Sequence, residues 1–123
     1  MSERPLVSLK LRLLHGDCFA MGPGKAALLE AIAETRSVAA AGRKLGLSYW
    51  KTRRLLEEIN LCFREPLVAT SKGGDGGGGS RVTEAGREAL ARFRAMEAAA
   101  GAVVAPLAEA YQELLAHRNL PLD

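Results

Sequence analysis

The chain has 123 residues, of which 48% are hydrophobic and 25% are charged, as in an ordinary folded domain that can bury a core. It contains no signal peptide and no apolar run long enough to span a membrane, so we expect a cytoplasmic protein without a membrane partner. Cys18 and Cys62 are far apart and match no metal or redox spacing. We therefore expect no metal ion, no cofactor, and a buried or half-buried thiol at Cys62.

The net charge of +3 is concentrated in the middle of the chain. Residues 36–64 contain seven basic and two acidic side chains, whereas residues 82–123 contain four basic and six acidic ones. This distribution favours a nucleic-acid contact in the middle of the chain and a protein contact toward its C-terminus.

The first third of the chain predicts a strand, a turn and a helix. Apolar and polar residues alternate over residues 8–15, which is typical of a half-buried strand. After a turn at Gly16 and Asp17, residues 18–21 form either a second strand or the start of a helix. Residues 25–35 are rich in helix formers and predict the first helix.

Residues 37–63 predict a helix-turn-helix. Ser37 can cap a short helix over 38–45, and Ser48 can cap a longer helix over 48–63. Gly46 can adopt the left-handed backbone conformation that the intervening turn requires. The buried stripe of the longer helix would contain Thr52, Leu55, Leu56, Ile59 and Phe63. A plain helical hairpin is the alternative, but the charge of this segment favours DNA binding.

The exposed side of the 48–63 helix is basic and aromatic in its N-terminal half, while Glu57 and Glu58 come later. This order opposes the helix dipole, which favours acids at the N-terminus, and so indicates an anionic partner there. Trp50 could contact that partner or pack beneath the turn.

A glycine-rich hairpin is predicted after this helix. Residues 67–70 and 81–83 suit short strands, and residues 71–80 suit a flexible loop between them, so the segment is typical of a wing on the DNA backbone. The glycine run lacks the Lys and Ser or Thr of a nucleotide-binding phosphate loop, which argues against nucleotide binding. A plain linker is the alternative.

Residues 84–117 predict a helix about 50 Å long at about 1.5 Å per residue, which Gly101 and Pro106 could bend or split. Its apolar seam is longer than a small domain can cover, so we expect it to meet a second copy of the chain, unless the helix folds back on its own domain. The seam consists of Leu90, Phe93, Met96, Ala100, Val103, Leu107, Tyr111 and Leu114. We expect a DNA-binding domain over 1–83, a dimerisation helix over 84–123, and a frayed end at 118–123.

Residues 22–32, the corner at 46–49, residues 57–60 and the glycine loop at 73–79 resemble the N-terminal DNA-binding domain of the ModE molybdate-responsive regulators. The glycine loop is the most specific part, because LysR-type regulators share the helix-turn-helix without it. The resemblance implies a mainly α fold with a small antiparallel sheet, namely a winged helix-turn-helix with a long C-terminal dimerisation helix. It also implies control of genes for molybdenum uptake or use.

Two departures from this family limit what can be transferred. Full-length members carry C-terminal molybdate-binding modules, whereas this sequence ends after the dimerisation helix, so we expect no oxyanion binding of that kind. Thr52 and Arg53 stand where many relatives have a small and an aromatic residue, and the large aromatic Trp50 comes earlier. The operator sequence and the base contacts therefore cannot be inherited from the family.

The leading hypothesis is a homodimeric transcriptional regulator that places the 48–63 helix in the major groove of double-stranded DNA and the 70–82 wing on the backbone. The expected DNA contacts are Ser37, Lys44, Ser48, Tyr49, Trp50, Lys51, Arg53, Arg54, Lys72 and Arg81. The alternative is an interaction module that forms mixed dimers with a sensor-bearing regulator and binds no operator itself. We do not expect an enzyme, because the sequence holds no paired-carboxylate or nucleophile pattern and His15 and His117 lie at opposite ends.

Overall fold

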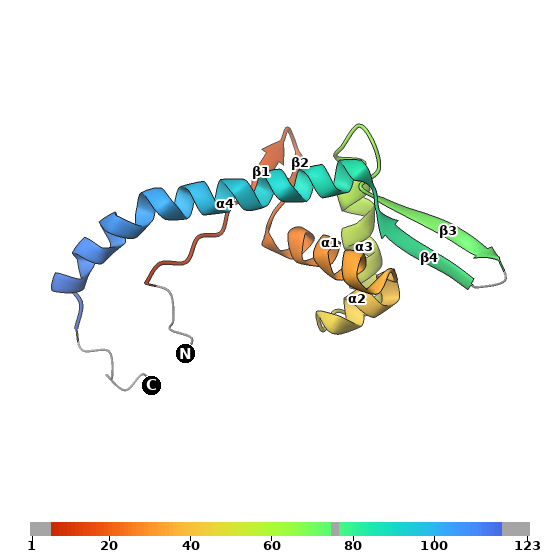
Figure 1. The fold of residues 1–123 in the computed structure, drawn as a ribbon, viewed down its shortest axis with the longest axis horizontal. Helices are drawn as coiled ribbons and strands as arrows, with labels where there is room; N and C mark the ends of the chain where they lie inside the picture. Colours follow the sequence, from red (N-terminus) through yellow and green to blue (C-terminus); the bar gives the residue numbers. More distant parts are fainter. Residues whose placement is uncertain (1–5, 75–76, 117–123) are drawn as a thin grey trace.

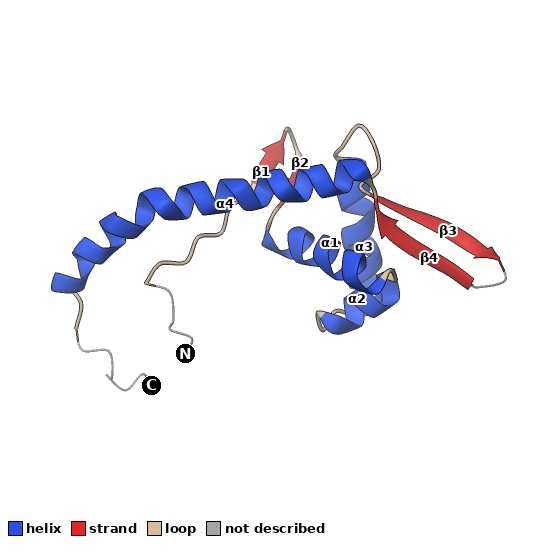
Figure 2. Ribbon diagram, viewed as in Figure 1, coloured by secondary structure: helices blue, strands red, loops and turns tan. Residues whose placement is uncertain are grey.

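The computed structural model describes residues 6–74 and 77–116 and is mainly helical, with two small antiparallel sheets of two strands each (Figures 1 and 2). This agrees with the predicted fold class. In chain order the elements are β1 (Leu13–His15), β2 (Cys18–Met21), α1 (Pro23–Thr35), α2 (Val38–Lys44), α3 (Tyr49–Leu61), β3 (Val68–Gly74), β4 (Gly77–Val82), α4 (Glu84–Ala110) and a 3-10 turn (Tyr111–Glu113).

The core lies where α1 meets α3, the base of the β3–β4 hairpin and the first half of α4. Leu28, Leu29 and Ile32 of α1 are fully buried, because this helix is covered on most sides by its neighbours. Phe93 of α4 is only 1% exposed and belongs to the same core. The prediction that Phe93 lies on a seam for a second chain is therefore wrong for this structure, since its side chain is used inside the domain.

The predicted helix caps are confirmed. The side-chain oxygens of Ser37 and Ser48 accept hydrogen bonds from Ala40 N (3.0 Å) and Lys51 N (3.1 Å), respectively. Thr83 caps α4 in the same way and accepts from Gly86 N at 3.0 Å. The helix bounds differ from the predicted ones. Helix α1 begins at Pro23 and not at residue 25, and α2 ends at Lys44 and not at residue 45. Helix α3 spans Tyr49–Leu61, within the predicted 48–63, and α4 ends at Ala110, seven residues before the predicted end. Gly46 has a φ of 72°, as the predicted turn between α2 and α3 requires.

Helices α2 and α3 touch at Gly42. A β-carbon at this position would lie 2.2 Å from Thr52 Oγ1, so a larger residue cannot be placed there without a shift. Thr52 is 1% exposed, and its hydroxyl donates to the carbonyl of Ser48 at 2.8 Å. Glycine on α2 and a buried threonine on α3 thus set the close packing of these helices.

The N-terminal hairpin is smaller than predicted. Only Leu13–His15 form a strand, paired with β2, and residues 8–12 are not in a strand. The alternation of apolar residues is nevertheless real, because Val7, Leu9 and Leu11 are half-buried while their neighbours are exposed. The alternation in the sequence therefore correctly indicated which side of this extended segment is buried. It did not indicate a strand, because the segment has no hydrogen-bonded neighbour.

The two cysteines form a disulfide, with Cα atoms 6.0 Å apart, which corrects the prediction of a thiol at Cys62. The bond joins β2 to the end of α3. Lys25 reinforces this junction from α1: it is 2% exposed, its ammonium donates to the carbonyl of Phe19, and it lies 3.3 Å from a carboxylate oxygen of Glu58. Sequence spacing could not reveal the pair, because residues 44 positions apart meet only in the folded chain.

The glycine-rich segment extends both strands of the hairpin, whereas the sequence predicted a loose loop over residues 71–80. Val68 pairs with Val82 and Ser71 with Gly79, with an irregularity before Gly74 pairs with Gly77. The hairpin projects away from the helices (Figure 1). Its base is held by Asn60, whose amide oxygen accepts from the backbone N–H groups of Leu67 and Val68 at 2.9 and 3.2 Å.

Helix α4 runs without a break through Gly101 and Pro106. Its first half is fixed to α1 by Arg94, which donates to both carboxylate oxygens of Glu30 at 2.6 and 3.1 Å and to Glu97 at 2.7 Å. These carboxylates raise the pKa of Arg94. The second half extends away from the domain and curves (Figure 1). Val103 and Leu107 are 67% and 66% exposed, and Tyr111, which directly follows the helix, is 62% exposed.

Candidate nucleic-acid interface

The N-terminal half of α3 presents a basic and aromatic surface. Trp50 is 80% exposed and Tyr49 is 58% exposed, with their rings edge to face at 5.7 Å. Trp50 therefore does not pack beneath the turn, which was one of its two expected positions. Lys51 and Arg54 are also exposed. The first turn of α3 contains no acidic residue, so nothing in that turn neutralises this charge.

This surface is fixed because the opposite side of α3 is buried. Thr52, Leu56 and Ile59 are at most 5% exposed and face the core, as the helical period predicted. Leu55 and Phe63 are partly buried beside them. The helix therefore cannot rotate without exposing its apolar side, and its basic side must face solvent.

An open groove of about 420 Å³ separates α3 from the wing. Arg53, Glu57 and Leu61, spaced four residues apart, form its helical side, and Val68 and Thr70 form its wing side. Asn60 also lines this groove and was not among the predicted site residues. In the sequence, Asn60 stands out only as a polar residue beside the buried stripe of α3. Its hydrogen bonds to Leu67 and Val68, at the start of the hairpin, are visible only in the structure.

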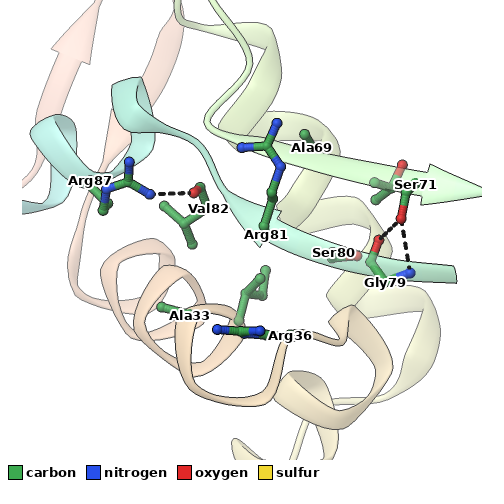
Figure 3. A pocket seen from close by; sticks show the side chains of 11 residues that line it. Ala33, Arg36, Ala69, Ser71, Gly79, Ser80, Arg81, Val82 and Arg87 are labelled. Atoms are coloured by element: carbon green, nitrogen blue, oxygen red, sulfur yellow. Dashed lines mark hydrogen bonds between the residues drawn. The ribbon is translucent and has the colours of Figure 1, made fainter. Parts of the chain in front are cut away.

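A second groove, of about 710 Å³, lies where the end of α1 meets the wing and the start of α4 (Figure 3). Three arginines line it, Arg36, Arg81 and Arg87, and each of them is exposed. Only Arg81 was expected to bind DNA. Arg36 directly follows α1 and Arg87 lies in the first turn of α4, and neither was among the predicted DNA contacts.

The predicted DNA contacts do not all lie on one surface. Arg53 lines the groove beside α3, whereas Arg81 lines the groove beside α1. Lys44 forms an ion pair with Glu34 of α1, in which both side chains are more than half exposed. Ser37 and Ser48 are helix caps. Lys72 lies in β3, and its side chain falls outside the described part of the structure, as does His117.

Residues 6–74 and 77–116 contain neither a metal-ligating cluster nor a helix that could cross a membrane. No group of three or more His, Cys, Asp or Glu side chains there is arranged to hold a metal ion. Within the same ranges, no helix combines the length and apolarity that crossing a membrane requires.

The chain is similar to several curated molybdenum-related proteins, although no family model matches it. It is 39% identical to the molybdenum-pterin-binding protein MopA of Rhodobacter capsulatus over 80% of this chain and 37% of that protein. It is 36% identical to the molybdenum transport protein ModE of Herbaspirillum seropedicae over 78% of this chain and 34% of that protein. It is 28% identical to the transcriptional regulator ModE of Yersinia pestis over 100% of this chain and 42% of that protein.

The chain thus spans between about a third and two fifths of the length of these relatives. The resemblance seen in the sequence is confirmed by relatives that carry the ModE name. Together with a helical domain that bears a two-stranded hairpin and a long C-terminal helix, this similarity identifies the chain as a ModE-like domain.

Proposed function

We propose that the chain is a sequence-specific DNA-binding domain of a transcriptional regulator of molybdenum-related genes, and that it acts as a homodimer. The observation that carries this proposal is the exposed basic and aromatic N-terminal half of α3, a helix that packs against α1, α2 and β2. The molybdenum role rests on the names of the relatives, which include a transcriptional regulator and two molybdenum proteins.

In the proposed complex, α2 and α3 act as a helix-turn-helix, and the first turns of α3 enter the major groove. Arg53 and Arg54 are positioned to reach base edges or phosphates, and arginine with guanine is the commonest specific contact. Tyr49 and Trp50 add apolar and polar contact area at the same end. The β3–β4 hairpin then follows the backbone beside the groove next to α3.

The second half of α4 supplies the proposed dimer contact. Val103 and Leu107 lie four residues apart on α4, and Leu114 follows the 3-10 turn after it. All three are at least 66% exposed, which leaves apolar side chains without a partner in the described chain. A second copy of the helix would cover these side chains symmetrically. The two α3 helices would then read half-sites one helical turn apart, about 34 Å, on a palindromic operator.

The proposal is tested by selecting bound sequences from random double-stranded DNA and measuring affinity by fluorescence anisotropy at several salt concentrations. Replacing Arg54 by alanine should weaken binding to the selected operator by about 1–3 kcal/mol if Arg54 reads a base. Arg64→Ala is the matched control, because Arg64 is exposed beyond the far end of α3. It should leave sequence preference unchanged.

Two outcomes would contradict the proposal. Affinity that does not fall with salt would be incompatible with phosphate contacts, which release counterions. A chain that dimerises yet enriches no sequence and retains no DNA would instead support the alternative, a module that pairs with a sensor-bearing regulator. Co-purification with such a relative would then be the next measurement.

A further inference from the structure

The groove lined by Arg36, Arg81 and Arg87, here called the arginine groove, has a strongly one-sided charge. Its remaining lining consists of apolar or hydroxyl-bearing residues and glycine, and no carboxylate lines it. Figure 3 shows the arginine side chains coming from the end of α1, from β4 and from the start of α4. Three positive charges around one groove favour an anionic ligand.

The described chain does not neutralise these charges. Lys44, Arg92 and Arg94 each form ion pairs with glutamates, but over residues 6–74 and 77–116 none of the three groove arginines has a carboxylate within 4.0 Å. Arg87 donates to the carbonyl of Val82 at 3.0 Å. This bond orients the guanidinium group of Arg87 and does not neutralise its positive charge. An anion bound along the groove would therefore be stabilised by positive charges that have no carboxylate partner in the described chain.

The frame of the arginine groove is fixed by backbone contacts. Arg36 has a left-handed φ of 58°, and its N–H donates to the carbonyl of Ile32 at 2.7 Å. Its own carbonyl accepts from the N–H of Ser80 at 3.0 Å, so the end of α1 is bonded directly to the free edge of β4. This bond brings Arg36 and Arg81 to the same groove although they are far apart in sequence.

The shape of the groove indicates the kind of anion. A single small oxyanion is held by donors that converge in a buried site, whereas these arginines are exposed and are distributed along an open groove of about 710 Å³. Arg36 also directly precedes Ser37 at the start of α2, which belongs to the proposed DNA-binding motif. An extended row of phosphates passing from α2 toward the base of the wing fits this arrangement.

We propose that the arginine groove binds the phosphate backbone of DNA beside the stretch that α3 reads. This inference rests on the proposed function and extends it, because it assigns Arg36 and Arg87 to the DNA contact and places Arg81 on a different side of the wing from α3. The contacts are to phosphates, so they add affinity and fix orientation without reading sequence.

The test is the salt dependence of DNA binding by the whole chain, on the selected operator and on a random duplex. Arg36→Gln and Arg81→Gln should each weaken binding by the same factor on both duplexes and lower the slope of log affinity against log salt by about 0.9. Arg36→Lys keeps the charge and should keep the slope. Arg64→Gln removes an exposed charge elsewhere and should also keep it. Thermal unfolding of each variant confirms that the fold is intact.

Three results would overturn the inference in distinguishable ways. If Arg54→Ala weakens operator binding while Arg36→Gln and Arg81→Gln leave the slope unchanged, the arginine groove is not a DNA contact and the proposed function stands. If inorganic phosphate binds the free protein and Arg36→Gln abolishes that binding without affecting DNA, the groove holds a free anion. If the unaltered chain binds neither duplex, the inference and the proposed function fail together.

Discussion

At the scale of single residues, the packing of α2 on α3 depends on a missing side chain. Gly42 is buried, and the space that a β-carbon would need is occupied by Thr52, whose own position is fixed by its hydrogen bond to Ser48. A well-packed interior cannot take up an added methyl group without strain. The orientation of α3, and with it the basic surface, therefore depends on glycine at position 42.

We expect Gly42→Ala to lower the free energy of unfolding by about 1–3 kcal/mol, because the added methyl group forces α2 and α3 apart. Urea denaturation followed by circular dichroism measures this change. Gly24→Ala is the matched control: it lies in α1 with no atom within 4 Å of its β-carbon position, and it should be neutral or slightly stabilising. Equal stabilities for the two variants would show that the close approach at Gly42 is unimportant.

At the scale of elements, the small β1–β2 hairpin is attached to the end of α3 at more than one point. The disulfide between Cys18 and Cys62 joins them covalently, and buried Lys25 bridges the carbonyl of Phe19 on β2 and Glu58 on α3. Lys25 also lies 4.2 Å from the centre of the Phe19 ring. This cluster fixes the C-terminal end of α3, opposite the end proposed to enter DNA.

Reduction of the disulfide should therefore destabilise the domain. Cross-linking residues 44 positions apart restricts the unfolded chain, and the chain-entropy model gives a contribution of roughly 4 kcal/mol as an upper expectation. Urea unfolding with and without dithiothreitol should show this loss for the oxidised protein. The Cys18→Ala variant should unfold identically under both conditions. Two free thiols in the oxidised native protein, counted by mass spectrometry after alkylation, would contradict the pairing.

At the scale of the whole molecule, α4 has two different halves. The first half belongs to the domain, since Phe93 is buried in the core and Arg94 is bonded to Glu30 of α1. The second half carries exposed Leu107 and Tyr111 and touches none of the core. A helix with an apolar stripe and no partner in its own chain is favoured to pair with a second copy.

We expect Leu107→Glu to convert the proposed dimer to a monomer, because it places a charge in the middle of the apolar stripe. Sedimentation velocity would show the shift in mass, and operator affinity should fall because the two half-sites are no longer bound together. Ala105→Glu adds the same charge at an exposed position on the other side of α4 and should remain dimeric. A monomeric unaltered chain would rule out this role for α4.

The sequence by itself determined the helices, their caps, the turn at Gly46 and the buried stripe of α3, because these depend on local spacing and on hydrogen bonds between near neighbours. It also indicated the exposed basic end of α3 and the family. Its predictions failed where the outcome depended on distant partners. The helical spacing of Phe93 matched the predicted dimer seam. Whether its side chain is buried by a second chain or by its own domain depends on which elements pack against that turn of α4.

Only the tertiary structure decided which distant residues meet. The disulfide forms because β2 packs against the end of α3, and the arginine groove forms because the carbonyl of Arg36 bonds to Ser80 on the edge of the wing. Neither contact leaves a periodic signal, since a pattern along the chain records how one element buries its own side. Contacts between elements depend on how those buried sides fit together, which is a property of the packed core.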